Sequence, residues 1–421
     1  MPVTRIAEPV GTHMPFPRDE YEQRWEALDA ELARLGYETA VLWGRSGGSY
    51  DRAGTITYLT NFASHSSGQE WSSGDSAVGR SFAALIVRRG HEPELHIAEP
   101  VITVEPRYVA VTSVAEHMED IGEGLAERLR ELGIEGRVAY LGDDFLPIQI
   151  NRTLVAGTPQ IEWVAEDFLL DQIQSHKSER ELDLYREAGV VACEALTAFM
   201  EALIRGERQC DAAAQAASII IRSGGGFQRV GCHTGPRSEL AMWDNPFYGY
   251  SDDAAQPGEM VRAWVYGPIR HGYWIDPGRS SACGDPTPAA KQLVEQGAGL
   301  TEYLISQIKA GVTPREVGIA GDDHVHKLGL SEDMGGAIWD LYGHGLSTFW
   351  HPPIIPAHGA ESFVNGRGFQ NVDQPFHAGQ VFTVETFLRE PNIGTATFEE
   401  VFIIQEGGVE RLTDRTPMLF W

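Results

Sequence analysis

The segment that decides the fold is Gly258–Ser281, with the sequence GEMVRAWVYGPIRHGYWIDPGRSS. Over residues 261–266, small apolar residues alternate with large or charged ones, which is the period-two pattern of a β-strand with two different faces. A Gly-Pro pair interrupts this run, and a second run, Tyr273–Ile275, leads to Asp276. The pattern predicts a β-hairpin that holds an acid at the end of its second strand.

Three later segments, each predicted to be a strand or a strand end, also present acidic or imidazole side chains. They are YGHGLSTFWHPP with His344 and His351, QVFTVETF with Glu385, and ATFEEVFIIQ with Glu399 and Glu400. Three carboxylates and an imidazole that converge in an enclosed site raise one another's pKa unless a cation neutralises them. We therefore expect one shared site that binds a positive group, either a metal ion or a cationic part of a substrate.

The order of these segments resembles the superfamily of methionine aminopeptidase, prolidase and creatinase. That order is a hairpin with an acid, GHG with a second histidine seven residues on, FTVE, and an acidic pair at the head of a last strand. The resemblance implies an α/β (α+β) fold, with a smaller creatinase-like domain over residues 1–174 and a pita-bread catalytic domain over residues 175–421. Residues 175–203 resemble the Lys-Ser-x-x-Glu helix that opens the catalytic domain, which places the boundary near Gln174.

Position by position, the resemblance implies four metal ligands. They are Asp276, His344, Glu385 and Glu399. Trp264 stands where the aminopeptidases have a fifth ligand, an Asp, so we expect at most one divalent transition metal, Mn, Fe, Co or Zn. Creatinase also lacks this Asp, binds no metal and holds a guanidinium with its acids, so a site without metal is the alternative.

Other departures from the aminopeptidase pattern favour a hydrolase that is not a peptidase. Pro352 follows the second histidine where the aminopeptidases have Glu. The chain also departs from creatinase, because Asp244 stands at the position of creatinase's catalytic His. The expected reaction is hydrolysis of a C–N bond in a small amino-, amido- or guanidino-bearing molecule. The alternatives are a metal-dependent lyase, a divergent Xaa-Pro aminopeptidase, or a catalytically silent binding module.

Further roles follow from the resemblance and from local chemistry. The expected catalytic groups are His351, Asp244, His233 and Glu385. The expected substrate-binding residues are Trp264, Tyr266, Trp350 and Arg80. An indole at a ligand position can offer its face to a cation or a flat substrate. Arg80 resembles the creatinase Arg that reaches into the neighbouring subunit, which implies a homodimer with Arg80 contributed across the interface.

Length and composition narrow the class of protein. A chain of 421 residues with 42% hydrophobic content is large enough for two domains. A formal charge of -27 argues against nucleic acid or an anionic membrane as a partner and leaves a small molecule as the expected one. Four cysteines without CxxC spacing predict reduced thiols in a cytoplasmic protein. We expect neither a signal peptide nor a membrane span, since no apolar run approaches about 18 residues.

Within residues 1–174 the hydrophobic pattern predicts alternating helices and strands. Helices are expected over Asp19–Leu35 and Asp120–Leu132. Strands are expected at ITYLTNF, SFAALIVRR, PELHIA and VAYLG. The Ser/Gly-rich stretch Ala63–Val78 is predicted to be a long loop.

Overall fold

The computed structural model describes residues 3–6, 10–45, 53–64, 70–73, 76–79, 82–142, 145–226, 229–235, 238, 249–329, 335–336, 341–362 and 368–421. The chain divides into two compact units, Met1–Gln174 and Ser175–Trp421. Each unit has its own sheet and its own hydrophobic core.

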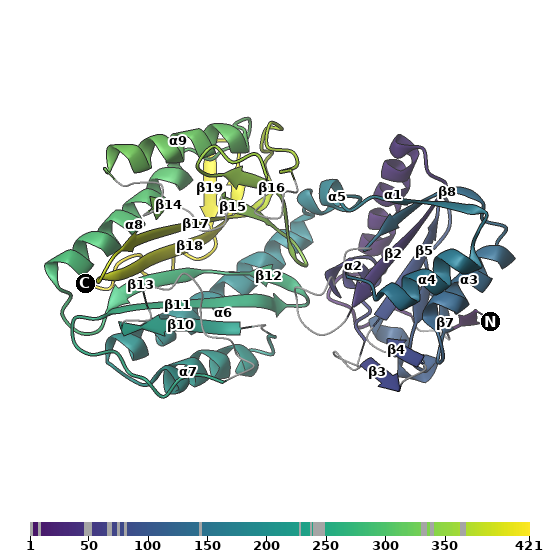
Figure 1. Ribbon diagram of the computed structural model, residues 1–421, viewed down its shortest axis with the longest axis horizontal. Coiled ribbons are helices and arrows are strands. Elements are labelled where there is room, and N and C mark those ends of the chain that lie inside the picture. Colours follow the sequence, from purple (N-terminus) through teal and green to yellow (C-terminus); the bar gives the residue numbers. More distant parts are fainter. Residues whose placement is uncertain are drawn as a thin grey trace. The chain divides into compact units, whose positions relative to one another are not determined.

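The first unit is an α/β structure built on a mixed sheet (Figure 1). Its described strands run in the order β1-β7-β6-β5-β2-β8-β9. Their bounds are β1 Thr4–Arg5, β2 Thr39–Arg45, β5 Phe82–Arg88, β6 Glu94–Ile97, β7 Ser113–Glu116, β8 Gly136–Leu141 and β9 Ile161–Ala165. The helices of this unit are α1 Arg18–Leu35, α2 Ala53–Thr60, α3 Ile121–Glu131 and α4 Ile148–Gly157, and α5 Asp171–Ser175 follows at its end.

Two expectations for this unit were wrong. The segment ITYLTNF contributes to helix α2 instead of a strand, and the expected loop contains a hairpin of β3, Glu70–Ser73, and β4, Ser76–Gly79. Tertiary contacts explain the helix, because its last carbonyl groups need partners. Arg24 Nη1 donates to the Tyr58 carbonyl over 2.7 Å, and Trp25 Nε1 donates to the Leu59 carbonyl over 2.8 Å. These donors come from α1 and override the strand propensity of the local sequence.

The second unit is built on one large antiparallel sheet. The main path through its described strands is β10-β11-β13-β18-β17-β15-β16, while β12 pairs with β11, β14 with β17 and β19 with β18. Their bounds are β10 Arg229–Thr234, β11 Met260–Arg270, β12 Tyr273–Ile275, β13 Gly278–Ala282, β14 Gly335–Gly336, β15 Leu341–Leu346, β16 Trp350–Pro356, β17 Val381–Glu390, β18 Gly394–Gln405 and β19 Gly408–Arg411. The helices are α6 Glu179–Ile204, α7 Gln209–Arg222, α8 Pro288–Ser306 and α9 Pro314–Lys327.

Helix α6 begins at Glu179, directly after Ser178 of the Lys-Ser-x-x-Glu segment. Ser178 caps its first turn by accepting a hydrogen bond from the Glu181 amide, and the Glu181 carboxylate accepts one from the Ser178 amide. The predicted hairpin is also present, because β11 pairs antiparallel with β12 and with β13. This hairpin brings Asp276, between β12 and β13, to the middle of the sheet.

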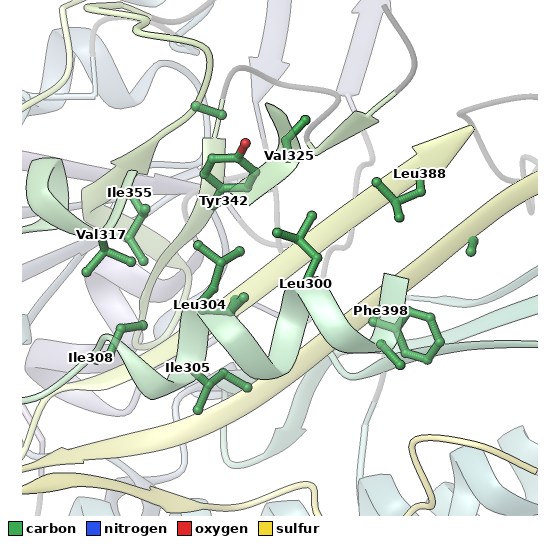
Figure 2. Close-up of a cluster of buried hydrophobic side chains, with 14 of the residues drawn as sticks. Leu300, Leu304, Ile305, Ile308, Val317, Val325, Tyr342, Ile355, Leu388 and Phe398 are labelled. Atoms are coloured by element: carbon green, nitrogen blue, oxygen red, sulfur yellow. The ribbon is translucent and has the colours of Figure 1, made fainter. Parts of the chain in front are cut away.

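Alternation along β17 and β18 separates a helix-covered face from a polar face. Phe382 and Val384 in β17, and Phe398 and Phe402 in β18, belong to the apolar core that α8 and α9 cover. Figure 2 shows Leu300 and Leu304 of α8 with Leu388 and Phe398 of the strands in this core. The intervening residues of the same two strands, which include Glu385 and Glu399, therefore point to the opposite face.

Candidate metal centre

A row of paired residues crosses four strands on the polar face of the sheet. Trp264 in β11 is the Cα partner of Gly278 in β13, Gly278 is the partner of Glu399 in β18, and Glu399 is the partner of Glu385 in β17. A Cβ atom on Gly278 would lie 2.3 Å from Trp264 Nε1. The absence of a side chain there lets the indole cross β13, and Trp264 Nε1 donates to Glu399 Oε2 over 3.2 Å.

The imidazole of His344 faces three carboxylates at nearly equal distances. Its Nε2 lies 3.8 Å from Asp276 Oδ2, 4.0 Å from Glu385 Oε1 and 4.0 Å from Glu399 Oε1. Its Nδ1 lies 3.2 Å from the carbonyl oxygen of Gly345. A carbonyl oxygen can only accept a hydrogen bond, so Nδ1 is the ring nitrogen that carries the proton. This contact leaves the Nε2 lone pair directed at the acids.

Glycines in the GHG segment allow strand β15, which carries His344, to lie close to β17. A Cβ atom on Gly343 would lie 2.1 Å from the carbonyl oxygen of Thr383, so a larger residue would push β15 away from β17. A Cβ atom on Gly345 would lie 2.8 Å from Cε1 of His351. Close packing therefore requires glycine at both positions, and the distance of His344 from the acids depends on this packing.

Burial disfavours the charged forms of the three acids and of His344 when no cation is bound. Burial raises the pKa of Asp276 to about 7 and, together with the charge of Asp276, raises the pKa of Glu385 to about 8. The pKa of Glu399 is raised well above its usual range by burial and then by both neighbouring acids. Burial lowers the pKa of His344 to about 4, so its imidazole is neutral at pH 7.

These residues fit a divalent metal ion. Donor atoms of Asp276, His344 and Glu399 all lie within 4.8 Å of one another, and Asp276 Oδ1 has no hydrogen-bond partner among the described residues. Donors about 2.1 Å from one tetrahedral ion lie about 3.4 Å apart, which is close to the observed 3.8–4.0 Å. Glu385 contacts the same imidazole but lies outside the tightest group, so it is the peripheral member of the set.

The aromatic side chains next to the acids are buried. Phe387 stacks with Trp264, with ring centroids 6.1 Å apart, and the guanidinium carbon of Arg262 lies 5.6 Å from the Trp264 ring centre. The cation over this indole is therefore a side chain of the protein. Tyr266 packs against Trp274, with ring centroids 6.0 Å apart, and the guanidinium carbon of Arg229 lies 5.7 Å from the ring centre of Tyr266.

His351 adjoins the metal ligands from β16. Its Cα partner is Gly345, and its Nδ1 donates to the carbonyl oxygen of Pro352. Its Nε2 is buried and has no hydrogen-bond partner among the described residues. Burial, followed by the charge of Lys177, lowers the pKa of His351 to about 3, so Nε2 is a neutral acceptor.

His233 is engaged elsewhere. It lies on β10 opposite Arg262, and its Nδ1 accepts a hydrogen bond from Arg262 Nη2 over 2.6 Å. A guanidinium can only donate, so the Nδ1 lone pair is occupied and cannot also serve as a proton acceptor for a substrate. The sequence analysis did not single out Arg262, although its place two residues before Trp264 was a signal that it faces the same side of the sheet.

Three other expected site residues cannot be placed in the same way. Arg80 and Asp244 lie outside the described residues. Trp350 is the first residue of β16, and its side chain lies outside the described part of the chain.

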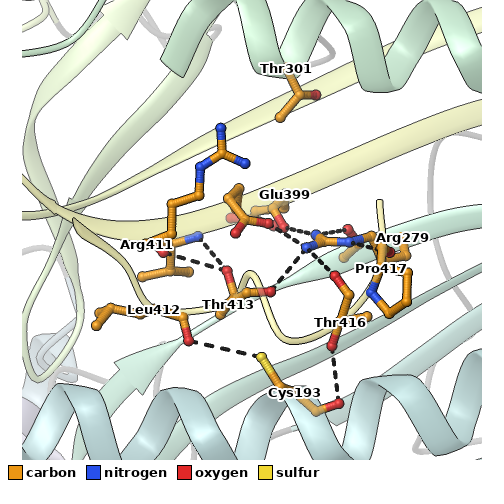
Figure 3. A network of polar contacts seen from close by, with 12 residues as sticks. Cys193, Arg279, Thr301, Glu399, Arg411, Leu412, Thr413, Thr416 and Pro417 are labelled. Atoms are coloured by element: carbon orange, nitrogen blue, oxygen red, sulfur yellow. Dashed lines mark hydrogen bonds and ion pairs between the residues drawn. The ribbon is translucent and has the colours of Figure 1, made fainter. Parts of the chain in front are cut away.

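The second acid of the pair in β18 has a different role from the first. Glu400 points to the helix-covered face, where it forms a fully buried ion pair with Arg279. Arg279 also donates to the carbonyl groups of Glu399, Thr413 and Pro417, as the network in Figure 3 shows. Strand alternation thus separates Glu399 at the metal centre from Glu400 in a structural network.

Residues 183–406 match the model for metallopeptidase family M24. The probable dipeptidase PepE of Mycobacterium bovis is 26% identical over 245 residues, which cover 57% of this chain and 59% of that dipeptidase. An Xaa-Pro dipeptidase of Pyrococcus horikoshii is 23% identical over 290 residues, or 68% of this chain and 74% of that enzyme. The crystal structure of X-Pro aminopeptidase from Thermotoga maritima has a TM-score of 0.72 at 18% identity, covering 92% of this chain and 97% of that chain.

These matches confirm the predicted superfamily and its two-domain pita-bread fold. They contradict the expectation of a non-peptidase hydrolase, because the matching family is one of metallopeptidases and the relatives named above are peptidases. That expectation gave too much weight to Trp264 and Pro352, two departures from the aminopeptidase pattern. The four candidate metal ligands lie together in space.

Proposed function

Because the chain belongs to metallopeptidase family M24, we propose that this hydrolase is a peptidase of short substrates that works with one divalent metal ion. The observation that supports the proposal best is the contact of His344 Nε2 with Asp276, Glu385 and Glu399 at 3.8–4.0 Å. The named relatives point to dipeptides, including those with proline in the second position.

The donor set supports one metal position. Asp276, His344 and Glu399 would hold the ion, with Glu385 at its edge, and the ion would be Mn, Fe, Co or Zn. When bound, it would polarise the scissile carbonyl and lower the pKa of a water molecule. Trp264 occupies the side on which the aminopeptidases have another acid, and an indole offers no ligand atom for a second ion.

The side chains around this position can handle the protons of a hydrolysis. Glu385 is the least tightly grouped carboxylate, so we assign it to accept a proton from the attacking water. His351 Nε2 has no partner among the described residues and lies on the β16 side of the ligands. We assign it to take this proton from Glu385 and to pass it to the leaving amine.

A peptide panel tests this function. Purified protein, stripped with a chelator and reloaded separately with Mn²⁺, Co²⁺, Fe²⁺ or Zn²⁺, would be incubated with Xaa-Pro and other dipeptides, and free amino acids would be quantified. We expect release that depends on the added metal and that falls at least about 100-fold in Glu399→Gln. Failure of every metal and every dipeptide would favour a catalytically silent binding module instead.

We also propose a homodimer in which Arg80 reaches the site of the second subunit, on the resemblance to creatinase. Light scattering should give a mass of two chains, and Arg80→Ala should raise KM without changing the metal content. A monomeric protein with full activity would exclude this arrangement.

None of the helices in the described ranges is both long and apolar enough to cross a bilayer. In the described part of the chain, none of the four cysteines forms a disulfide.

A further inference from the structure

Arg262 is a fully buried cation whose charge the described residues leave unpaired. The residue is 1% exposed, and it lies on β11 between His233 of β10 and Ser280 of β13. Nη2 donates to His233, whereas Nε and Nη1 have no hydrogen-bond partner in the described part of the chain. Burial lowers the pKa of Arg262 to about 9, so the group still carries its charge at pH 7.

Arg279, in the same sheet, is a buried arginine whose charge and hydrogen-bond donors all have partners. It is equally buried, yet it pairs with Glu400, and each of its nitrogens donates to at least one oxygen. A buried charge without a counter-charge is costly, so proteins retain one mainly where it has a partner from outside the chain or a functional use. The contrast indicates that Arg262 is kept for an anion that the described part of the chain does not supply.

The position of Arg262 relates this anion to the metal centre. Strand alternation puts Arg262 on the same face as Trp264, and Trp264 links it to Glu399 through the indole ring and the 3.2 Å hydrogen bond. Strand β11 is two strand spacings, about 10 Å, from β18. This is within the combined reach of an arginine side chain and one substrate residue.

The two ends of the sheet path distinguish the two halves of a substrate. His351, which we assign to the leaving amine, lies on β16 at one end, whereas Arg262 and His233 lie on β11 and β10 at the other. The amine half of a substrate whose scissile carbonyl is at the metal centre therefore lies toward β16. Its acyl half lies toward Arg262.

We propose that Arg262 is a specificity residue that binds a carboxylate on the acyl half of the substrate, so the preferred peptides have Glu or Asp before the scissile bond. The inference rests on the peptidase function proposed above. The indole of Trp264 adds no negative charge beside Arg262, whereas the three acids of the metal centre repel a carboxylate placed on their own side. Together these charges orient an acidic acyl group toward β11.

Binding of the acyl-side product tests the proposal without any need for turnover. Free glutamate and its uncharged isostere glutamine would be titrated into metal-loaded protein by calorimetry. We expect the wild type to bind glutamate about 10- to 100-fold more tightly, as charge-assisted hydrogen bonds to a guanidinium would give. Equal affinities for glutamate and glutamine would overturn the proposal even if the protein were an active peptidase.

Variants separate this role from a structural one. Arg262→Met should remove the preference for glutamate while the melting temperature stays level or rises, because an unpaired buried charge is replaced by an apolar chain of similar length. Arg262→Lys should retain part of the preference. Arg389→Met, which removes an exposed arginine from β17, is the matched control and should bind both ligands as the wild type does. A preference that survives in Arg262→Met would refute the assignment.

Kinetics and a salt control complete the test. Wild-type kcat/KM should favour Glu-Pro over Gln-Pro by the same 10- to 100-fold, and Arg262→Met should bring the two substrates together. If chloride alone stabilised the wild type but not Arg262→Met, and glutamate did not compete with it, the occupant would be a free inorganic anion and the proposed specificity would be wrong. Glutamate preference in binding with no hydrolysis of any dipeptide would support the anion site and reject the peptidase function.

Discussion

Trp264 Nε1 donates a hydrogen bond to Glu399 Oε2 over 3.2 Å, so an indole is the immediate neighbour of a carboxylate that faces His344. Gly278 makes this contact possible because it has no side chain between the two strands. The candidate ligands of one metal position thus lie next to an aromatic ring. This arrangement determines both the expected metal stoichiometry and the charge on the β11 side of the site.

Replacing Trp264 with Asp should add a carboxylate that can ligate a second metal ion and should remove the indole from the side of the substrate site. Trp264→Asp should bind a second metal ion, measured by elemental analysis, and should lose at least tenfold in activity on the preferred substrate. Trp264→Phe is the control, since it keeps an aromatic ring at this position while it removes the pyrrole ring and its N–H donor, whose hydrogen bond is worth about 1 kcal/mol. We expect one ion and activity within a few fold of wild type for Trp264→Phe. Full activity with one ion in Trp264→Asp would show that the indole does not occupy the second-metal space.

His351 should matter for turnover and not for metal binding. His351→Ala should lower kcat by about 100-fold while the metal content stays the same, because Nε2 handles a proton and ligates nothing. His326→Ala, which removes an exposed histidine from α9, provides the control. An unchanged kcat in His351→Ala would exclude this histidine from proton transfer.

The stability of the metal-free protein should fall as the pH rises above about 6.5, where His344 and His351 are neutral in both the folded and the unfolded state. The folded state raises the pKa of Asp276 to about 7 and of Glu385 to about 8, so up to about pH 8 these two groups hold more protons in the folded state than in the unfolded chain. The stabilisation is complete below about pH 4 and is lost as the pH passes through 7 and 8. Metal binding reverses this trend because it favours the ionised carboxylates.

Melting temperatures at pH 6.5 and pH 8.5, with and without metal, measure this effect. We expect a large decrease for the metal-free wild type, a smaller decrease for metal-free Glu385→Gln, and little decrease for the metal-loaded wild type. A metal-free protein equally stable at both values would mean that the acids are not enclosed together.

The ion pair of Arg279 and Glu400 should support the fold without affecting the chemistry. Removing one partner leaves a buried charge unpaired, so Glu400→Gln should lower the free energy of unfolding by about 3–5 kcal/mol. Metal content of the folded fraction should remain that of the wild type. Loss of metal at unchanged stability would place Glu400 in the site instead.

Much of the site could be predicted from the sequence because its information is local. Alternation in residues 261–266 gave the hairpin strand with its two faces, and the glycines beside His344 marked a close approach between strands. The helix at Ala53–Thr60 could not be predicted in this way. Its stabilising donors, Arg24 and Trp25, are 34 residues away from their acceptors, and local propensity contains no trace of them.

The function was harder to predict than the ligands for a related reason. Trp264 was interpreted as a substrate-binding residue in place of a lost metal ligand, whereas the structure shows its Nε1 hydrogen-bonded to Glu399 and the guanidinium of Arg262 over its ring. The contact between His233 and Arg262 joins strands 29 residues apart in sequence, and it changes His233 from an expected base into a partner of a cation. Such pairings become visible only when the register of the sheet is known.

A metal titration of peptidase activity tests the central claim most directly. Metal-free protein at a known concentration would receive increasing Mn²⁺, or whichever ion is most active, while the hydrolysis of a preferred dipeptide is followed. We predict that activity rises linearly and stops rising at one ion per chain. Activity that requires two ions per chain, or no metal-dependent hydrolysis at any ratio, would contradict a single-metal peptidase.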